Sequence, residues 1–173
     1  LVAAIAGLAR LVRWRGLATI AHPSLFALHV GYAFLPLGYL LWAGSIVSGD
    51  PRLLDAARHA FGTGVLGVMC VAVQTSVVRR HEGRPLARDP LGDAAVVLHL
   101  VAAIARLATP FAEEPLGATG LAAIAWIAGQ AFLLAALASA WRHTSARCAA
   151  VPSGSPTGGD VASRGALERV DEI

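Results

Sequence analysis

Four long apolar segments dominate this chain and limit it to one kind of fold. A bilayer core about 30 Å thick takes about 20 apolar residues of α-helix to cross, and the segments span residues 25–47, 54–78, 91–110 and 116–141. The chain is 56% hydrophobic and 14% charged, whereas soluble domains carry about 25% charged residues. Because isolated strands cannot satisfy their backbone in lipid, we expect an all-α, polytopic transmembrane helical bundle in a lipid bilayer.

The two ends of the chain differ from these four full spans. Residues 1–12 are largely apolar but only about half a span long, and the arginines lie at the end of this segment (Arg10) and after it (Arg13 and Arg15), instead of preceding it as in a signal peptide. We interpret this segment as a truncated N-terminal helix, so that the chain is the C-terminal portion of a larger bundle whose N-terminal half is missing. Residues 142–173 are rich in Pro, Gly and Ser, a composition that cannot bury a core. We therefore predict a transmembrane domain over 1–141 and a disordered tail over 142–173.

Arginines predict the orientation of the spans. The loops 7–23 and 79–90 are rich in arginine, whereas the loop 109–115 carries only the acids Glu113 and Glu114. The positive-inside rule then places the C-terminus in the cytoplasm. The chain has no lysine and much alanine and glycine, which is typical of GC-rich genes and favours a bacterial cytoplasmic (inner) membrane. These flanking arginines account for the pI near 9.5, so we do not expect nucleic acid as a partner.

Three histidines lie within or close to the apolar spans, at His29, His59 and His99. An ionisable side chain costs free energy in hydrocarbon, so such a residue is by default a ligand, a relay or a pairing site. With a rise of about 1.5 Å per residue, His29 and His59 differ in depth by on the order of 15–20 Å, which is too far for one metal ion to take both. His99 lies near mid-bilayer and could equally bond to a neighbouring helix.

Polar residues on the second span share one helical face. At about 100° per residue, this stripe contains His59, Gly62, Thr63, Leu66, Cys70 and Gln74. We expect the stripe to face the protein interior, because lipid offers no hydrogen-bond partners. Glycines such as Gly64 and Gly67 would let a neighbouring backbone or a flat cofactor come close, and helix packing alone is the alternative.

On the first span, His29, Tyr32 and Pro36 share a face. A proline inside a helix removes a backbone hydrogen bond and kinks the helix, and the freed carbonyls can line a site. The Tyr32 hydroxyl could hydrogen-bond to an imidazole or a propionate. A kink that serves only packing remains the alternative.

On the third span, Arg106 follows His99 by about two helical turns on the same face. Its long side chain could reach water at the nearby membrane surface. It could instead pair with an acidic group such as a haem propionate, because arginine binds carboxylates through two parallel hydrogen bonds. His59 and Arg106 lie at similar depth, so we expect them in one site.

Two blocks of the sequence resemble the NnrS family of bacterial membrane proteins. The first block runs from His59 through Gly64, Gly67 and Met69 to the loop His81-Glu-Gly-Arg84-Pro85. The family pattern there is a histidine, two spaced glycines, a methionine and a His-Thr-Gly-Arg-Pro loop. The second block, Leu28-His29-Val-Gly31-Tyr32-Ala-Phe-Leu-Pro36-Leu-Gly38, resembles the family segment Leu-His-Leu-Gly-Tyr-Ala-Trp-Pro-Leu-Gly. Weaker agreement extends the resemblance over about residues 14–141.

This resemblance implies a membrane protein that carries haem and copper and acts in nitric oxide response, meaning nitrosative stress or denitrification. It implies His59 and His29 as candidate metal or haem ligands, together with a set of supporting residues. The supporting residues are Tyr32, Gly64, Gly67 and Met69. From its place in the third span, His99 is a further candidate ligand, and Arg106 is a candidate partner of a propionate or another anion. Neutral imidazole binds haem iron and copper, and a thioether suits Cu(I). The loop residues His81 and Arg84 could bind an anion, a metal or a partner, or only fix the topology.

Other classes of function are less consistent with the sequence. It shows no nucleophile–base pair, carboxylate dyad or phosphate loop, which argues against a hydrolase, and we assign no catalytic residue. The main alternative is a transporter or permease in which His59, His99 and Arg106 line a pathway beside a helix kinked at Pro36. A structural subunit whose polar residues only pack helices is the third possibility.

Overall fold

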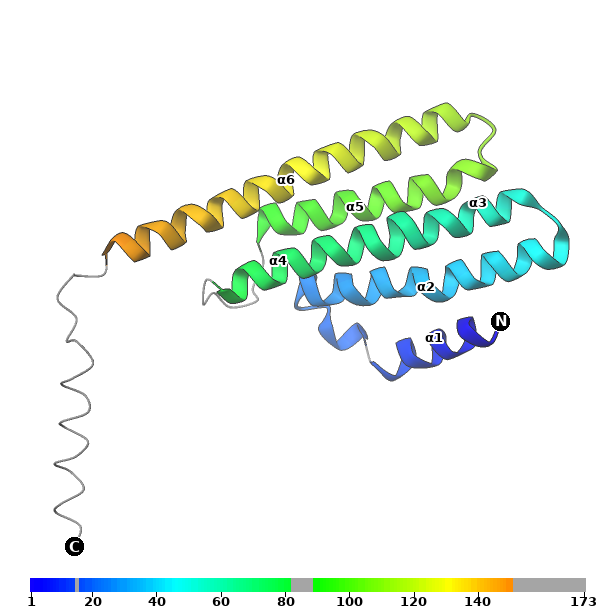
Figure 1. The fold of residues 1–173 in the computed structure, drawn as a ribbon, viewed down its shortest axis with the longest axis horizontal. Helices are drawn as coiled ribbons and strands as arrows, with labels where there is room; N and C mark the ends of the chain where they lie inside the picture. Colours follow the sequence, from blue (N-terminus) through cyan, green and yellow to red (C-terminus); the bar gives the residue numbers. More distant parts are fainter. Residues whose placement is uncertain (15, 82–88, 151–173) are drawn as a thin grey trace, which may run out of the picture. The chain divides into compact units, whose positions relative to one another are not determined.

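Helices make up the regular structure of residues 1–14, 16–81 and 89–150, the part of the chain that this computed structural model describes (Figure 1). A short helix α1 (Val2–Arg13) and a 3₁₀ turn η1 (Gly16–Thr19) lead into α2 (Pro23–Ser48). The next long helix has three parts in direct succession, which are α3 (Pro51–His59), the π-helical η2 (Ala60–Val68) and α4 (Met69–His81). Then follow α5 (Pro90–Ala108), the 3₁₀ turn η3 (Thr109–Phe111) and α6 (Pro115–Ala150).

Four helical stretches are long and apolar enough to cross a membrane. They are Leu25–Ser48, Pro51–Arg80, Pro90–Phe111 and Pro115–Arg142. Each overlaps one of the four segments expected from the sequence, and the shorter α1 precedes them. The prediction of an all-α bundle with four full spans and a shorter N-terminal helix is confirmed.

The chain divides into two compact units, Leu1–Ala140 and Trp141–Ile173. The first unit contains the candidate site residues that the structure describes. In the second unit, residues 141–150 continue α6, so the range predicted to be a disordered tail begins with helix. Residues 151–173 lie outside the described residues, and their disorder stays a prediction.

Local sequence signals explain where the helices begin and end. Four of them start at a proline, whose missing N–H and fixed φ suit the first helical turn: Pro23, Pro51, Pro90 and Pro115. Between α2 and α3, Gly49 adopts a left-handed conformation with φ of 72° and ends α2, as glycine commonly does at a helix C-terminus. Asp50 then caps α3, because its carboxylate accepts the Arg52 backbone N–H at 2.9 Å.

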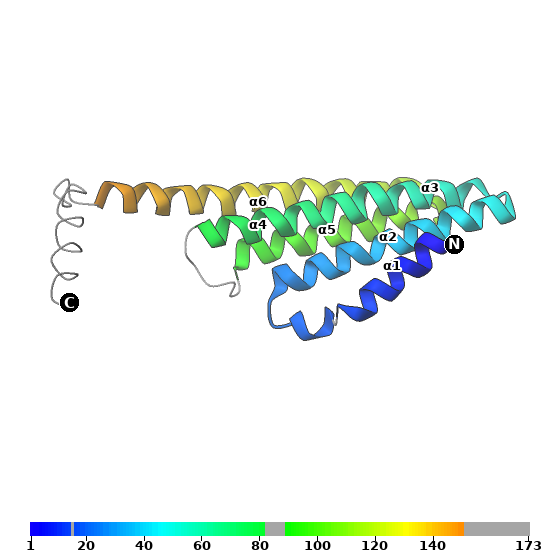
Figure 2. The same ribbon diagram turned by 60° about the horizontal axis from the view of Figure 1, so that its bottom comes forward.

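The helices of the first unit pack side by side, with α2 and α5 on either side of the three-part helix and α1 against α2. α2 contacts α1 on one side and α3, η2 and α4 on the other, while η2 also contacts α5 (Figures 1 and 2). One buried core cluster joins α2, η2 and α5 through Phe34, Ala60, Val68 and Ala103. A second cluster joins α4, α5 and α6 through Val71, Ala95 and Leu133, so the core of this unit follows the three-part helix along its contacts with its neighbours.

Small residues allow this close packing. A Cβ atom added at Gly67 would lie 2.8 Å from the Trp126 ring, and one added at Gly64 would collide with the Phe34 ring. Within membranes, helix association depends on such close contacts because lipid is as apolar as the side chains. The predicted close approach at Gly64 and Gly67 is therefore made by aromatic rings of this chain.

The polar stripe predicted on the second span does not face the interior of the described unit. Gly62, Leu66, Cys70 and Gln74 are exposed there, whereas Ala56, Ala60, Gly64 and Val68 are buried. Gly62, Leu66, Cys70 and Gln74 do share one face, as the periodicity predicts, but that face is the exposed one. The prediction was wrong in assuming that polarity decides which face is buried. Small residues that permit close packing line much of the buried face, which also contains Thr75 and Arg79.

Candidate functional site

His29 lies beside an apolar cavity between α1, η1 and α2. The cavity has a volume of about 600 Å³, and its walls include Leu11, Val12, Phe26 and Val30 as well as the imidazole. Cofactor and small-molecule pockets typically have volumes of about 300–1,000 Å³ and mostly apolar walls. The His29 cavity therefore has the size and lining of a cofactor site.

One hydrogen bond determines which nitrogen of His29 can act as a ligand. Nδ1 lies 2.9 Å from the carbonyl oxygen of Leu25, one turn earlier on α2. Because a carbonyl only accepts, Nδ1 carries the proton, and the lone pair of the neutral ring is on Nε2. Among the described residues, Nε2 has no hydrogen-bond partner. Metal-binding histidines typically donate their other ring N–H to a backbone carbonyl in this way.

Residues before α2 hold the His29 ring in place. The Trp14 ring meets it edge-on with the centroids 5.9 Å apart, and Trp14 also contacts the Tyr32 ring at 4.9 Å. In η1, a Cβ added at Gly16 would lie 2.9 Å from Cδ2 of His29. The Thr19 hydroxyl donates to the Gly16 carbonyl at 2.6 Å, which fixes this turn against the imidazole. Tyr32 thus supports His29 indirectly, through Trp14.

Like His29, His99 donates Nδ1–H to the carbonyl one turn earlier on its helix, but its second ring nitrogen, Nε2, also has a protein partner. Nδ1 lies 2.7 Å from the carbonyl of Ala95, and Nε2 lies 3.2 Å from the amide nitrogen of Gln130 on α6. The residue is fully buried, and the Trp126 ring lies 4.7 Å from its ring centroid. Both ring nitrogens are therefore engaged, as in the pairing between helices considered from the sequence. Sequence reasoning did not single out Gln130, although a primary amide in an apolar span is itself a signal.

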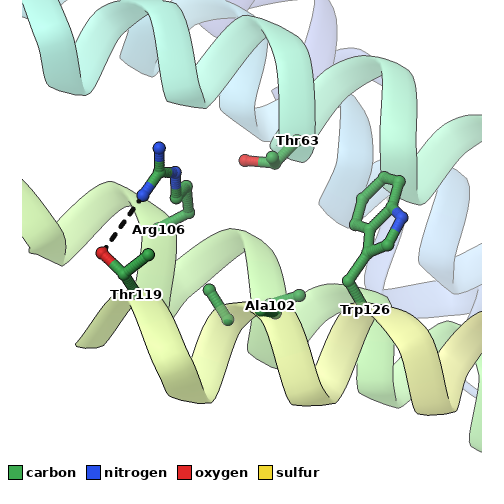
Figure 3. A pocket seen from close by; sticks show the side chains of 7 residues that line it. Thr63, Ala102, Arg106, Thr119 and Trp126 are labelled. Atoms are coloured by element: carbon green, nitrogen blue, oxygen red, sulfur yellow. Dashed lines mark hydrogen bonds between the residues drawn. The ribbon is translucent and has the colours of Figure 1, made fainter. Parts of the chain in front are cut away.

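His59 and Arg106 have separate neighbours. His59 Nε2 lies 3.5 Å from a carboxylate oxygen of Asp55, which is long for a hydrogen bond. Arg106 Nη1 donates to the Thr119 hydroxyl at 3.2 Å (Figure 3). Arg106 and Thr63 line a cavity of about 220 Å³, and His59 is not among the described residues that line it. Thr63 connects the two, because its hydroxyl donates to the His59 carbonyl at 2.7 Å. The Arg106 guanidinium is also close enough to the His59 ring for their charges to interact.

The remaining predicted residues do not complete a metal site. Among the described residues, no three His, Cys, Asp or Glu side chains form a group that could hold a metal ion. Met69 packs against Gly31 of α2, where an added Cβ would lie 2.6 Å from the Met69 Cγ. The His81 side chain and Arg84 lie outside the described residues. Copper therefore stays a prediction from the family resemblance, whereas haem requires only one or two protein ligands.

Comparison with known proteins identifies the family. No curated protein and no solved structure matches the chain significantly. The family model described as NnrS protein matches residues 1–144, which include all four membrane spans. The match covers most of the chain and agrees with the sequence blocks around His29 and His59. The chain therefore belongs to the NnrS family of membrane proteins.

Proposed function

We propose that this chain helps to bind haem, through Nε2 of His29, in a membrane protein of the NnrS type that acts in the response to nitric oxide. The single observation that carries the proposal is the state of His29: Nδ1 donates to the Leu25 carbonyl while Nε2 remains available beside an apolar cavity of about 600 Å³. Consistent with this function, we place the protein in the bacterial cytoplasmic membrane with its C-terminus inside.

The residues around His29 fit a haem group. The cavity walls are apolar, which suits a porphyrin, and the Nδ1–H bond to Leu25 orients the ring and raises the basicity of Nε2. Trp14 and the η1 turn hold the ring from the side. A bound haem would supply an iron site for nitric oxide, which is apolar enough to reach it through the bilayer. The chain itself supplies the ligand, its orientation and an apolar wall.

His59 is the second candidate ligand, supported by its place in the family pattern and by its half-buried position on α3. The permease alternative has less support. His99 is fully buried with both ring nitrogens in hydrogen bonds, and the described residues that line the Arg106 cavity do not include it.

The test compares three histidines in the full-length protein purified from membranes. Haem content per protein and the Soret spectrum are measured for His29→Ala, His59→Ala and His99→Ala. We expect His29→Ala to lose the haem or to convert it to a spectrally different form, and added imidazole to restore the spectrum by occupying the vacated space. We expect His99→Ala to keep the haem content per folded protein.

Haem content and spectrum unchanged in His29→Ala would reject His29 as a ligand. If His59→Ala alone changes them, the haem site lies at α3. A protein without haem in all forms, including the wild type, would reject the function itself.

A further inference from the structure

A second cavity lies between η2, α5 and α6, apart from the His29 site. Figure 3 shows Arg106 and Ala102 on α5, Thr63 on η2, and Thr119 and Trp126 on α6, around a shared space. Its volume is about 220 Å³, smaller than the roughly 300–1,000 Å³ of cofactor pockets but several times the roughly 30 Å³ that a water molecule occupies. Any ligand of this cavity must be small.

Arg106 places a positive charge in this cavity without a carboxylate to balance it. Its side chain is half-buried near the end of the apolar stretch Pro90–Phe111, and a charge in such a stretch is costly unless it is paired or reaches water. In the part of the chain that the structure describes, its hydrogen bond is to the neutral Thr119 hydroxyl, and no carboxylate lies within ion-pair distance. Most of the guanidinium N–H donors thus lack a protein acceptor among these residues.

The other residues that line the cavity limit the charge and the hydrogen-bonding groups that a ligand can have. Thr119 accepts its hydrogen bond from Arg106, so its own hydroxyl hydrogen remains available to a second acceptor. The Thr63 hydroxyl already donates to the His59 carbonyl. Alanines form much of the remaining wall, and one arginine balances one negative charge. A flat anion with two oxygen atoms matches the guanidinium, which forms two parallel hydrogen bonds to such groups.

We propose that Arg106 and Thr119 form a binding site for a small, monovalent, planar oxyanion, of the class of formate or nitrate. The guanidinium donates to the oxygen atoms, and the Thr119 hydroxyl orients the guanidinium and donates to the anion. This site is independent of the proposed haem site, because the two cavities share none of their described lining residues.

The test measures binding of ¹³C-formate and ¹⁵N-nitrate by NMR to the full-length protein in zwitterionic lipid nanodiscs. We expect saturable binding that weakens roughly tenfold or more in Arg106→Gln, because a charge-assisted hydrogen bond is lost. Arg58→Gln is the matched control: Arg58 is an exposed arginine on α3 that lines a different cavity. It should bind as the wild type does.

Further variants keep the proposal testable if Arg106→Gln fails to fold. Thr119→Val should weaken binding roughly fivefold, since it removes one hydroxyl but keeps the shape, and Thr119→Ser should restore it. Sulfate at equal ionic strength should not compete, because it is divalent and tetrahedral. Absence of saturable binding to the wild type, equal binding by wild type and both the Arg106 and Thr119 variants, or full competition by sulfate would each overturn the proposal.

Discussion

His29 and His99 make the same hydrogen bond within their own helices through Nδ1, but the surroundings of their second ring nitrogen, Nε2, differ. In each, Nδ1 donates to the carbonyl four residues earlier, at 2.9 Å to Leu25 and at 2.7 Å to Ala95. Nε2 of His99 meets the Gln130 amide, whereas Nε2 of His29 has no hydrogen-bond partner among the described residues and its ring borders a cavity. The helix thus sets the tautomer of both rings, and the neighbouring helix decides whether the second nitrogen is used for packing or is free for a ligand.

Removal of the His99 ring should give the largest loss of stability. His99→Ala leaves a cavity in a fully buried site and an unpaired Gln130 amide, which together cost about 2–4 kcal/mol. SDS-induced unfolding in mixed micelles measures the free energy of unfolding, and His22→Ala, at an exposed position, is the control. A loss no larger in His99→Ala than in His22→Ala would mean that the Gln130 pair does not hold α5 to α6.

Removal of the Gln130 amide tests the pairing itself. Gln130→Leu leaves Nε2 of His99 buried without a partner and should cost about 1–3 kcal/mol. The double variant His99→Leu/Gln130→Leu removes both polar groups, so it should cost clearly less than the sum of the two single variants. The same unfolding measurement applies, and strict additivity would show that the two side chains do not interact.

A methyl group added beside His29 tests whether the position of this imidazole controls haem binding. Gly16→Ala places a Cβ 2.9 Å from the imidazole and should displace the ring. We expect haem binding to weaken roughly tenfold, because mutation of residues that orient a metal ligand typically costs about 10–100-fold in affinity. Gly62→Ala is the control, because nothing lies within 4 Å of a Cβ there. Haem titration of the purified apoprotein measures both, and equal affinities would argue against His29 as the ligand.

The smallest effect should come from the turn between α2 and α3, which belongs to neither histidine site. The Arg52 side chain, hydrogen-bonded to Asp50, lowers the pKa of this carboxyl below its usual value of 3.8. Asp50 therefore stabilises the fold at pH values above its unfolded-state pKa, and this contribution is lost as pH falls through the lower folded-state pKa. Asp50→Asn keeps a capping side chain and should remove only this acid dependence. The measurement is the free energy of unfolding of both proteins as a function of pH, and an identical pH dependence would contradict this role of Asp50. The Soret band should be the same in both proteins.

The lengths of the apolar segments were sufficient to predict the four spans, because the thickness of a bilayer fixes the length of a helix that crosses it. Single-helix periodicity predicted that Gly62, Leu66, Cys70 and Gln74 share a face, but it did not predict that this face is exposed, because the packing of neighbouring helices decides which face is buried. It also did not predict the partner of His99, because the register of α6 against α5 depends on contacts far apart in the sequence. The cavity at His29 depends on the η1 turn that folds back on α2, which no local pattern encodes.

The indole of Trp126 has three different neighbours. Its edge rests on Gly67, its ring approaches that of His99, and its side chain borders the space around Arg106. A change in either the α5–α6 contact or the contents of that space therefore alters the surroundings of one native fluorophore. With the other tryptophans replaced by phenylalanine, the emission wavelength of Trp126 becomes an intrinsic optical sensor of this region.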